Sequence, residues 1–147
     1  MPRSLPVDGF QLAYDRSGSG APVILLHGWP GDRSDYRVLA PDLAGSCDVV
    51  VPDLRGFGES DKHPADPAEQ YSAVAQARSV VGLIRELGLD RPVLAGYDIG
   101  SRIAQTVAEA LKRYRQELGG GERDATAAPL VLDGQKVRIV GRIYPEE

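Results

Sequence analysis

Cysteine is nearly absent from the sequence, and long apolar runs are absent altogether. Cys47 is the one cysteine in 147 residues, so no disulfide can link two parts of the chain, and this usage is typical of a reducing compartment. The longest strongly apolar run, residues 23–26, is far too short to cross a bilayer, and residues 1–10 lack an apolar core of signal-peptide length. These absences predict a cytoplasmic protein with no part in the membrane.

An excess of positive charge is also missing. The formal net charge is −4 and the sequence pI is about 5.2, with charges of both signs spread along the chain, so no nucleic-acid partner is expected. The sequence has no cluster of metal-ligating residues and no phosphate-binding loop, so neither a metal nor a cofactor is expected. A length of 147 residues, of which 42% are hydrophobic and 26% charged, is typical of one soluble globular domain.

Short apolar runs alternate with helical patterns over the first 118 residues. Runs of branched apolar residues without polar alternation are typical of strands buried on both faces, as in a parallel sheet. Four strands are expected at residues 10–14, 23–26, 48–51 and 92–95, and three helices at residues 34–43, 67–87 and 101–118. This order predicts an α/β fold with a mainly parallel sheet and helices on both faces, whose ligands bind at the carboxyl ends of the strands.

Local signals set several boundaries within this region. Asp66 can cap a helix whose first turn holds Pro67. Gly88 suits the left-handed position that follows the helix. The turn cluster at residues 17–20 predicts a hairpin-like connection after the first strand.

The character of the sequence changes after residue 118. Residues 1–118 are expected to form the amino-terminal part of a domain, and the stretch 119–128 a flexible linker. Two short apolar runs flank Asp133-Gly134, a dipeptide that favours a two-residue hairpin turn. Residues 129–147 are therefore expected to form a β-hairpin, to which the sequence assigns no role.

The segment Gly96-Tyr97-Asp98-Ile99-Gly100 is the central chemical feature. It joins an expected buried strand to an expected helix, and a sharp strand-to-helix turn needs small residues on either side of its centre. Such a turn forces the middle residue out at the top of the sheet, which predicts Asp98 as the nucleophile of a nucleophile elbow. A simple helix N-cap is the alternative role for Asp98.

A second segment, His27-Gly28-Trp29-Pro30, ends the first expected buried strand and should lie beside Asp98. Backbone N–H groups in this position can stabilise a developing oxyanion, together with the N–H of Ile99. Pro30 has no N–H, so Trp29 is the expected donor. The alternative is a tight turn in which Trp29 packs on the core.

A third segment, D-L-R-G-F-G-E-S at residues 53–60, reads as a structural loop whose Asp53 and Arg55 hydrogen-bond its backbone. Taken in order, the three segments resemble the α/β-hydrolase superfamily, over about residues 10–108. An aspartate at the centre of the turn is similar to the epoxide hydrolases and the haloalkane dehalogenases, and the H-G-W-P form is closer to the epoxide hydrolases. Dehalogenases often carry Trp after the nucleophile, where this chain has Ile99.

The resemblance implies hydrolysis of a small-molecule substrate in two steps. The carboxylate of Asp98 would form an ester, and a water activated by a His with an acidic partner would then cleave it. In the family this pair follows a lid domain. The two histidines of this chain, His27 and His63, have no such context, so the chain is expected to be truncated and to lack the pair.

Three functions stay open. The first is an α/β-hydrolase resembling the epoxide hydrolases, the second a haloalkane-dehalogenase-like hydrolase, and the third a non-catalytic fragment that binds a partner chain. The strand at residues 93–95 would lie where the family places further strands. An unpaired apolar edge there predicts self-association, or a monomer that opens easily.

Overall fold

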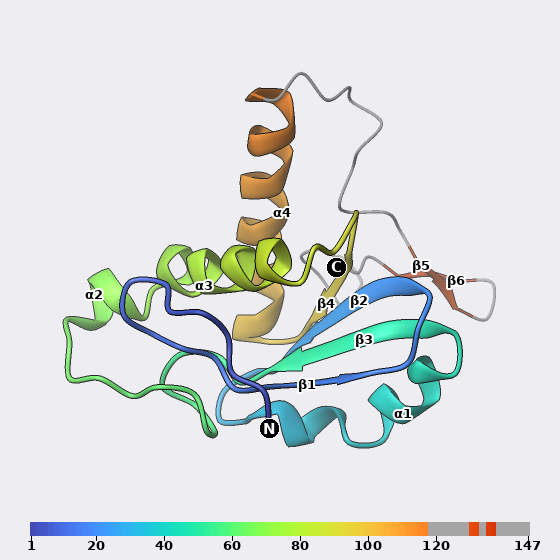
Figure 1. Cartoon of the computed structure of the whole chain (residues 1–147), viewed down its shortest axis with the longest axis horizontal. Coiled ribbons are helices and arrows are strands. Elements are labelled where there is room, and N and C mark those ends of the chain that lie inside the picture. The colour runs from blue at the N-terminus through green and yellow to red at the C-terminus, as the bar shows by residue number, and fades with distance from the viewer. Residues whose placement is uncertain (118–129, 133–134, 138–147) are drawn as a thin grey trace.

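The main sheet of the computed structural model, which describes residues 1–117, 130–132 and 135–137, has four strands in the order β1-β3-β2-β4 (Figure 1). The strands are β1 (Tyr14–Ser17), β2 (Ala21–Leu26), β3 (Cys47–Pro52) and β4 (Val93–Gly96). β2 runs parallel to both β3 and β4, and β1 is antiparallel to β3. The prediction of a mainly parallel sheet is confirmed. Leu26 pairs with Gly96, which brings the carboxyl ends of β2 and β4 side by side.

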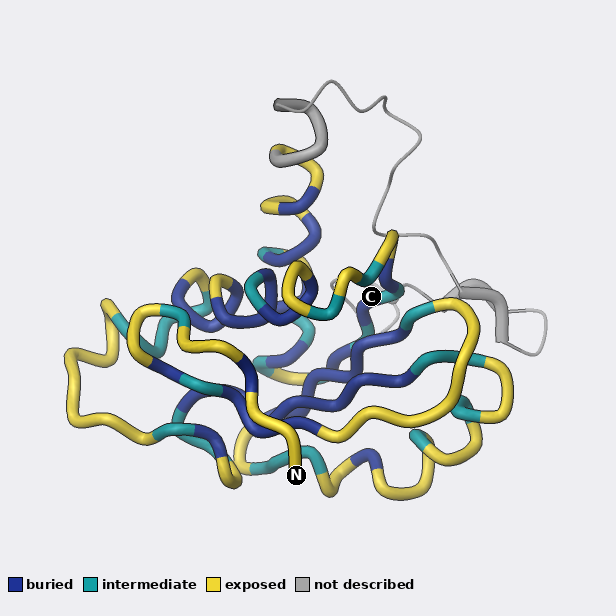
Figure 2. The backbone as a smooth tube through the Cα atoms, viewed as in Figure 1, coloured by how far each residue is buried: buried dark blue, intermediate teal, exposed yellow. Residues whose placement is uncertain are grey.

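Helices cover both faces of this sheet, as expected. The 3-10 helix η1 (Arg33–Tyr36) and α1 (Leu39–Ala44) lie on one face, while α3 (Ala73–Glu86) and α4 (Ile99–Glu117) lie on the other (Figure 1). Alternate strand residues point to the two faces. Ile24, Val50 and Leu94 belong to the core under α3 and α4. Leu25 and Val49 pack with Tyr36 on the opposite side. The central strands β2 and β3 are therefore buried over much of their length (Figure 2).

Two of the expected helices are each divided into two. The helix predicted over residues 34–43 is η1 followed by α1, because Pro41 cannot donate to the carbonyl of Arg37 and is tolerated only in the first turn of a new helix. The helix predicted over residues 67–87 is α2 (Pro67–Gln70) followed by α3. Ser72 starts α3 by accepting the N–H of Ala75 at 3.2 Å.

The predicted helix ends at Asp66 and Gly88 are confirmed. The Asp66 side chain accepts the N–H of Ala68 at 2.9 Å. Gly88 has a φ of +62°. The N–H of Leu89 donates to the carbonyl of Ile84 at 3.0 Å, which is the bond of a Schellman motif.

The first strand differs from its prediction. It spans Tyr14–Ser17 rather than residues 10–14, and it pairs with β3 instead of forming a hairpin with β2. The connection at residues 17–20 crosses over the start of β3. Gly18 and Gly20 permit this path, because they lie closer to the backbone there than a residue with a side chain could. A Cβ on Gly18 would lie 2.1 Å from the carbonyl oxygen of Cys47.

The carboxyl-terminal strands form a sheet of their own. β5 (Leu130–Leu132) pairs antiparallel with β6 (Gln135–Val137). The hairpin predicted over residues 129–147 extends beyond the described residues and stays a prediction. The predicted linker at residues 119–128, and the division at residue 118, lie outside the described residues and stay predictions. Within the described part of the chain, β4 has β2 as its one strand neighbour, so its other edge carries no strand.

This edge leads to a prediction about exchange and association. The backbone N–H groups of β4 that face away from β2 should exchange with solvent faster than those of β2 and β3, because no described strand protects them. Val93 and Ala95 are also only half-buried. Hydrogen exchange would measure the first effect, and light scattering after size exclusion would measure self-association. A strictly monomeric chain with strong protection throughout β4 would contradict the prediction.

Candidate active site

The turn between β4 and α4 holds Asp98 in a left-handed backbone conformation, with a φ of +52°. A Cβ on Gly96 would lie 2.5 Å from the carbonyl oxygen of Gly100, and a Cβ on Gly100 would lie 2.4 Å from that of Leu26. Strand and helix therefore meet without room for side chains, which explains both glycines. The Asp98 side chain is exposed at the carboxyl end of the sheet. Non-glycine residues in this conformation are uncommon, and among the described residues Asp8 and Arg91 share it.

The predicted second segment lies directly beside this turn. The N–H of Trp29 donates to Oδ2 of Asp98 at 2.9 Å, although the two residues are 69 positions apart. A Cβ on Gly28 would lie 2.9 Å from the Cβ of Asp98, so the backbone of Gly28 lies directly against the side chain of Asp98. The Trp29 side chain is 68% exposed. The alternative in which Trp29 packs on the core is therefore wrong.

Two backbone donors determine the electrostatics of Asp98. Hydrogen bonding by the N–H of Trp29, and then by that of Ile99, holds the pKa of the Asp98 carboxyl below its ordinary value. The N–H groups of Gly100 and Ser101, which would bond the side chain of an N-capping residue, donate instead to the carbonyls of Tyr97 and Asp98. The side chain of Asp98 is thus ionised at neutral pH, and it is hydrogen-bonded to the backbone of Trp29, which follows the neighbouring strand β2.

His27 is fully buried and has a structural environment. Its Nε2 accepts the N–H of Leu54 at 3.0 Å, so the proton lies on Nδ1, which is 2.9 Å from the carbonyl of Gly28. The ring also contacts Phe57 edge-on. With both nitrogens bonded inside the protein, His27 ties the end of β2 to the loop after β3 and has no free nitrogen to act as a base.

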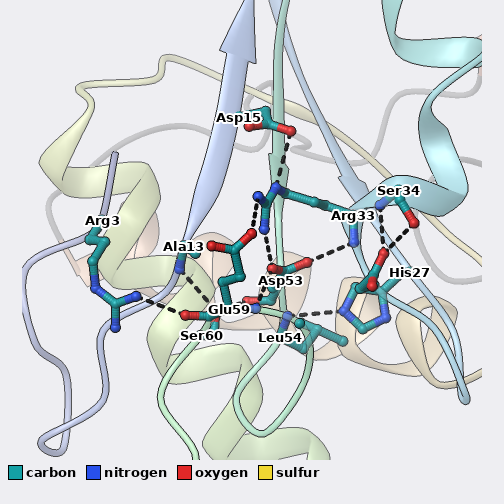
Figure 3. A network of polar contacts seen from close by, with 12 residues as sticks. Arg3, Ala13, Asp15, His27, Arg33, Ser34, Asp53, Leu54, Glu59 and Ser60 are labelled. Atoms are coloured by element: carbon teal, nitrogen blue, oxygen red, sulfur yellow. Dashed lines mark hydrogen bonds and ion pairs between the residues drawn. The ribbon is translucent and has the colours of Figure 1, made fainter. Parts of the chain in front are cut away.

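The loop that follows β3 is held by the buried carboxylate of Asp53 (Figure 3). Asp53 accepts the backbone N–H of Arg33 at 2.7 Å and that of Glu59 at 2.8 Å. The guanidinium of Arg33 pairs with Asp53, with Glu59 at 2.9 Å and with Asp15 at 3.1 Å (Figure 3). The expected backbone bond of Asp53 is confirmed. Arg33 was not predicted as a partner of Asp53, because no motif or periodicity distinguishes it in the sequence.

Arg55 differs from its prediction. Its fully buried side chain leaves its own loop and bonds other segments, with Ser79 of α3 at 2.7 Å and Asp8 at 2.9 Å. The guanidinium also lies 4.6 Å from the centre of the Phe10 ring. Hydrogen bonds from Arg78 and then from Arg55 lower the pKa of Asp8. Arg55 therefore anchors the amino-terminal segment to α3 rather than bonding the backbone of its own loop.

A pocket of about 720 Å³ opens beside the start of α4. The residues that line it include Phe57, His63, Tyr71, Ile99, Arg102 and Ile103. Ile99 directly follows Asp98, so the pocket adjoins the turn. His63, for which the sequence predicts no role, lies on its wall with Nε2 bonded to the carbonyl of Gly9 at 3.0 Å.

In residues 1–117 and the two short carboxyl-terminal strands, no three His, Cys, Asp or Glu side chains come together in a way that would hold a metal ion. In the same residues, no helix combines the length and the apolar character that crossing a membrane requires.

The Asp53 network leads to a stability prediction. Asp53→Ala should lower the free energy of unfolding by about 3 to 5 kcal/mol, because it leaves Arg33 and two backbone donors without their buried acceptor. Asp15→Ala is the matched control, since the Asp15 side chain is 63% exposed and also pairs with Arg33. It should cost less than about 1 kcal/mol. Urea unfolding would measure both, and equal losses would contradict this account.

The fold and the turn define an α/β hydrolase. Residues 21–114 match the family described as alpha/beta hydrolase fold, and the chain belongs to this family. It is 37% identical over 98 residues to a soluble epoxide hydrolase of Corynebacterium sp. (strain C12), a match that covers 67% of this chain and 33% of the relative.

Two other relatives bear on the chemistry. A fluoroacetate dehalogenase of Burkholderia sp. is 40% identical over 92 residues, covering 62% of this chain and 30% of the relative. The crystal structure of an epoxide hydrolase from Vigna radiata superposes with a TM-score of 0.67 at 26% identity, over 78% of this chain and 36% of that one. The chain thus spans about a third of the length of each of these three relatives.

Proposed function

We propose that Asp98 is the nucleophile of an epoxide-hydrolase-like enzyme and that Gly96–Gly100 is its nucleophile elbow. One observation carries the proposal: a left-handed, exposed carboxylate accepts the backbone N–H of Trp29 and interacts with that of Ile99. The N–H of Trp29 bonds Oδ2, so the attack is assigned to the other carboxylate oxygen. The N–H groups of Trp29 and Ile99 also lie where negative charge develops when the ester is later cleaved.

The chemistry follows from these positions. The free oxygen of Asp98 attacks a ring carbon of the epoxide, the ring C–O bond breaks, and the released oxygen takes up a proton from water or an acid. Oδ2 becomes the carbonyl oxygen of the ester and keeps its bond to Trp29. Attack of water at Cγ, with one proton of the water passing to a base, then places a negative charge on Oδ2, where the N–H groups of Trp29 and Ile99 stabilise it. Collapse of this intermediate releases the diol and restores the carboxylate.

A small-molecule substrate would occupy the pocket beside Ile99, reached from the exposed side of Asp98. The proposed location is the cytoplasm, and no nucleic-acid partner is proposed. Incubation with an aryl epoxide, followed by peptide mass mapping, tests the function. The expected result is a mass increase, equal to the epoxide, on the peptide that contains Asp98. A folded chain with no adduct on that peptide would contradict the proposal.

A dehalogenase is the second candidate, favoured by the 40% identity to the fluoroacetate dehalogenase. The same carboxylate would displace a halide from carbon and form the same kind of ester. Parallel incubations with an aryl epoxide, a haloacid and a haloalkane separate the two candidates. An Asp98 adduct from the epoxide alone supports the first candidate, and an adduct from a halogenated compound alone supports the second.

A role without catalysis remains the third candidate, and the edge of β4 that carries no strand among the described residues favours it. The occupant of that edge would be another polypeptide, either a partner chain or a second copy, that adds a strand through backbone hydrogen bonds. In this case the substitution Val93→Pro should abolish the association, while β2 and β3 stay protected from hydrogen exchange.

A further inference from the structure

Tyr97 lies between Asp98 and the turn that carries the Trp29 donor. A Cβ on Gly28 would lie 2.5 Å from Cε2 of Tyr97, so the phenol ring packs directly on the backbone of Gly28. The hydroxyl of Tyr97 donates to Oδ2 of Asp35, which lies 62 positions earlier in the chain. The ring therefore spans the distance from β4 to η1 across the turn.

Asp35 contacts the other end of the same turn. A Cβ on Gly31 would lie 2.1 Å from Oδ2 of Asp35, the oxygen that accepts the Tyr97 hydroxyl. The next residue, Tyr36, fixes this position because its buried hydroxyl donates to the carbonyl of Leu26 at 2.8 Å. The rings of Tyr36 and Tyr97 are also in edge contact, with centroids 6.1 Å apart. The turn at residues 28–31 is thus held at both ends.

The side chains in the middle of the turn give it little support. The Trp29 side chain is 68% exposed, and Pro30 is exposed and has no N–H. The peptide that carries the Trp29 N–H is held on one side by its Gly28 carbonyl, which lies 2.9 Å from Nδ1 of the buried His27. The other contacts of the turn are those at Gly28 and Gly31, where Tyr97 and Asp35 lie.

We propose that the hydrogen bond between Tyr97 and Asp35 positions the Trp29 N–H on the carboxylate of Asp98. Tyr97 and Asp35 are positioning residues, and the inference rests on the proposed role of Asp98 for its link to catalysis. The bond closes a ring of contacts, from Tyr97 to Gly28, along the turn to Gly31, and back through Asp35.

The protonation of Tyr97 fits this role. The hydrogen bond to Asp35 and then burial raise the pKa of the Tyr97 phenol above its ordinary value, while contact with the backbone of Gly28 lowers it by less. The phenol therefore remains a hydrogen-bond donor throughout the neutral range. Phenylalanine at this position would keep the ring against Gly28 and remove only the donor.

The test uses the one tryptophan of the chain. Labelling with 15N-tryptophan gives a single backbone amide signal, that of Trp29, whose exchange rate reports its bond to Asp98. Tyr97→Phe and Asp35→Ala should each speed this exchange by about tenfold or more and move the amide signal toward its position in Asp98→Ala. Asp35→Asn should stay within about twofold of the parent chain, because its amide oxygen still accepts the phenol hydrogen.

The two Asp35 variants form a matched pair, since both remove the charge and only one keeps the acceptor. An unchanged Trp29 amide in Asp35→Ala and Tyr97→Phe would overturn the proposal. So would equal losses in Asp35→Asn and Asp35→Ala, since the charge would then be responsible. The readout needs no chemistry at Asp98. If the Trp29 amide changes in these variants as expected but the parent chain forms no ester at Asp98, the positioning role is supported and the proposed function is rejected.

Discussion

Asp98→Asn should abolish covalent labelling by an epoxide, with a fall in rate of at least about 1,000-fold. Asparagine matches aspartate in shape and can still accept the N–H of Trp29, so the turn should be kept while the nucleophilic oxygen is lost. Mass mapping of the peptide that contains residue 98 would measure the loss. Asp42→Asn, which changes an exposed carboxylate of α1, is the control and should label like the parent chain.

The pH dependence of labelling follows from the same two donors. Only the ionised carboxylate attacks, and the N–H groups of Trp29 and Ile99 lower its pKa from the ordinary 3.8. The labelling rate should therefore be level through the neutral range, and its midpoint should lie below 3.8, where the carboxylate takes up a proton. A midpoint near pH 6 would contradict the hydrogen bonding at Asp98.

With excess epoxide, the 147-residue chain should accumulate about one ester per molecule and then stop. Cleavage of the ester needs a base to activate water, and loss of such a base typically slows an enzyme by about four orders of magnitude or more. The chain has two histidines. His27 is fully buried with both nitrogens bonded, and His63 bonds the carbonyl of Gly9 through Nε2.

Time courses of diol release and of ester content would test this second expectation. A stoichiometric burst with no later release is the predicted course. Sustained release that Asp98→Asn abolishes would contradict it, and the variant His63→Gln would then show whether His63 supplies the base from its place on the pocket wall. In the predicted case His63→Gln leaves the size of the burst unchanged.

The parts of the site that the sequence predicts are the positions at which only one type of residue can adopt the required geometry. Gly96 and Gly100 lie where no Cβ fits, so their spacing predicts the turn and the exposure of Asp98. Pro30 lacks an N–H, which predicts Trp29 as the donor. These inferences need only local chemistry, and they hold because the neighbouring strands β2 and β4 pair as a parallel sheet requires.

The remaining contacts depend on partners that no local pattern identifies. Arg33 meets Asp53 from 20 positions away, and Tyr97 meets Asp35 from 62. The pairing of β1 with β3 likewise depends on the path of a glycine-containing connection over another loop. The breaks at Pro41 and Ser72 are different, because both residues are recognisable breaking or capping signals that the helical periodicity concealed.

The strand order β1-β3-β2-β4 has a thermodynamic consequence for the donors at Asp98. Trp29 follows the central strand β2, whereas Ile99 follows β4, which has one described strand neighbour, so local opening of β4 would separate the two N–H groups. Any ligand that needs both N–H groups would bind only the state in which β4 is paired with β2, and would shift the population toward that state. A polypeptide that pairs with the other edge of β4, which carries no described strand, would favour the same state. Occupancy of the site and of the edge should therefore be positively cooperative, with each raising the affinity for the other by the same factor.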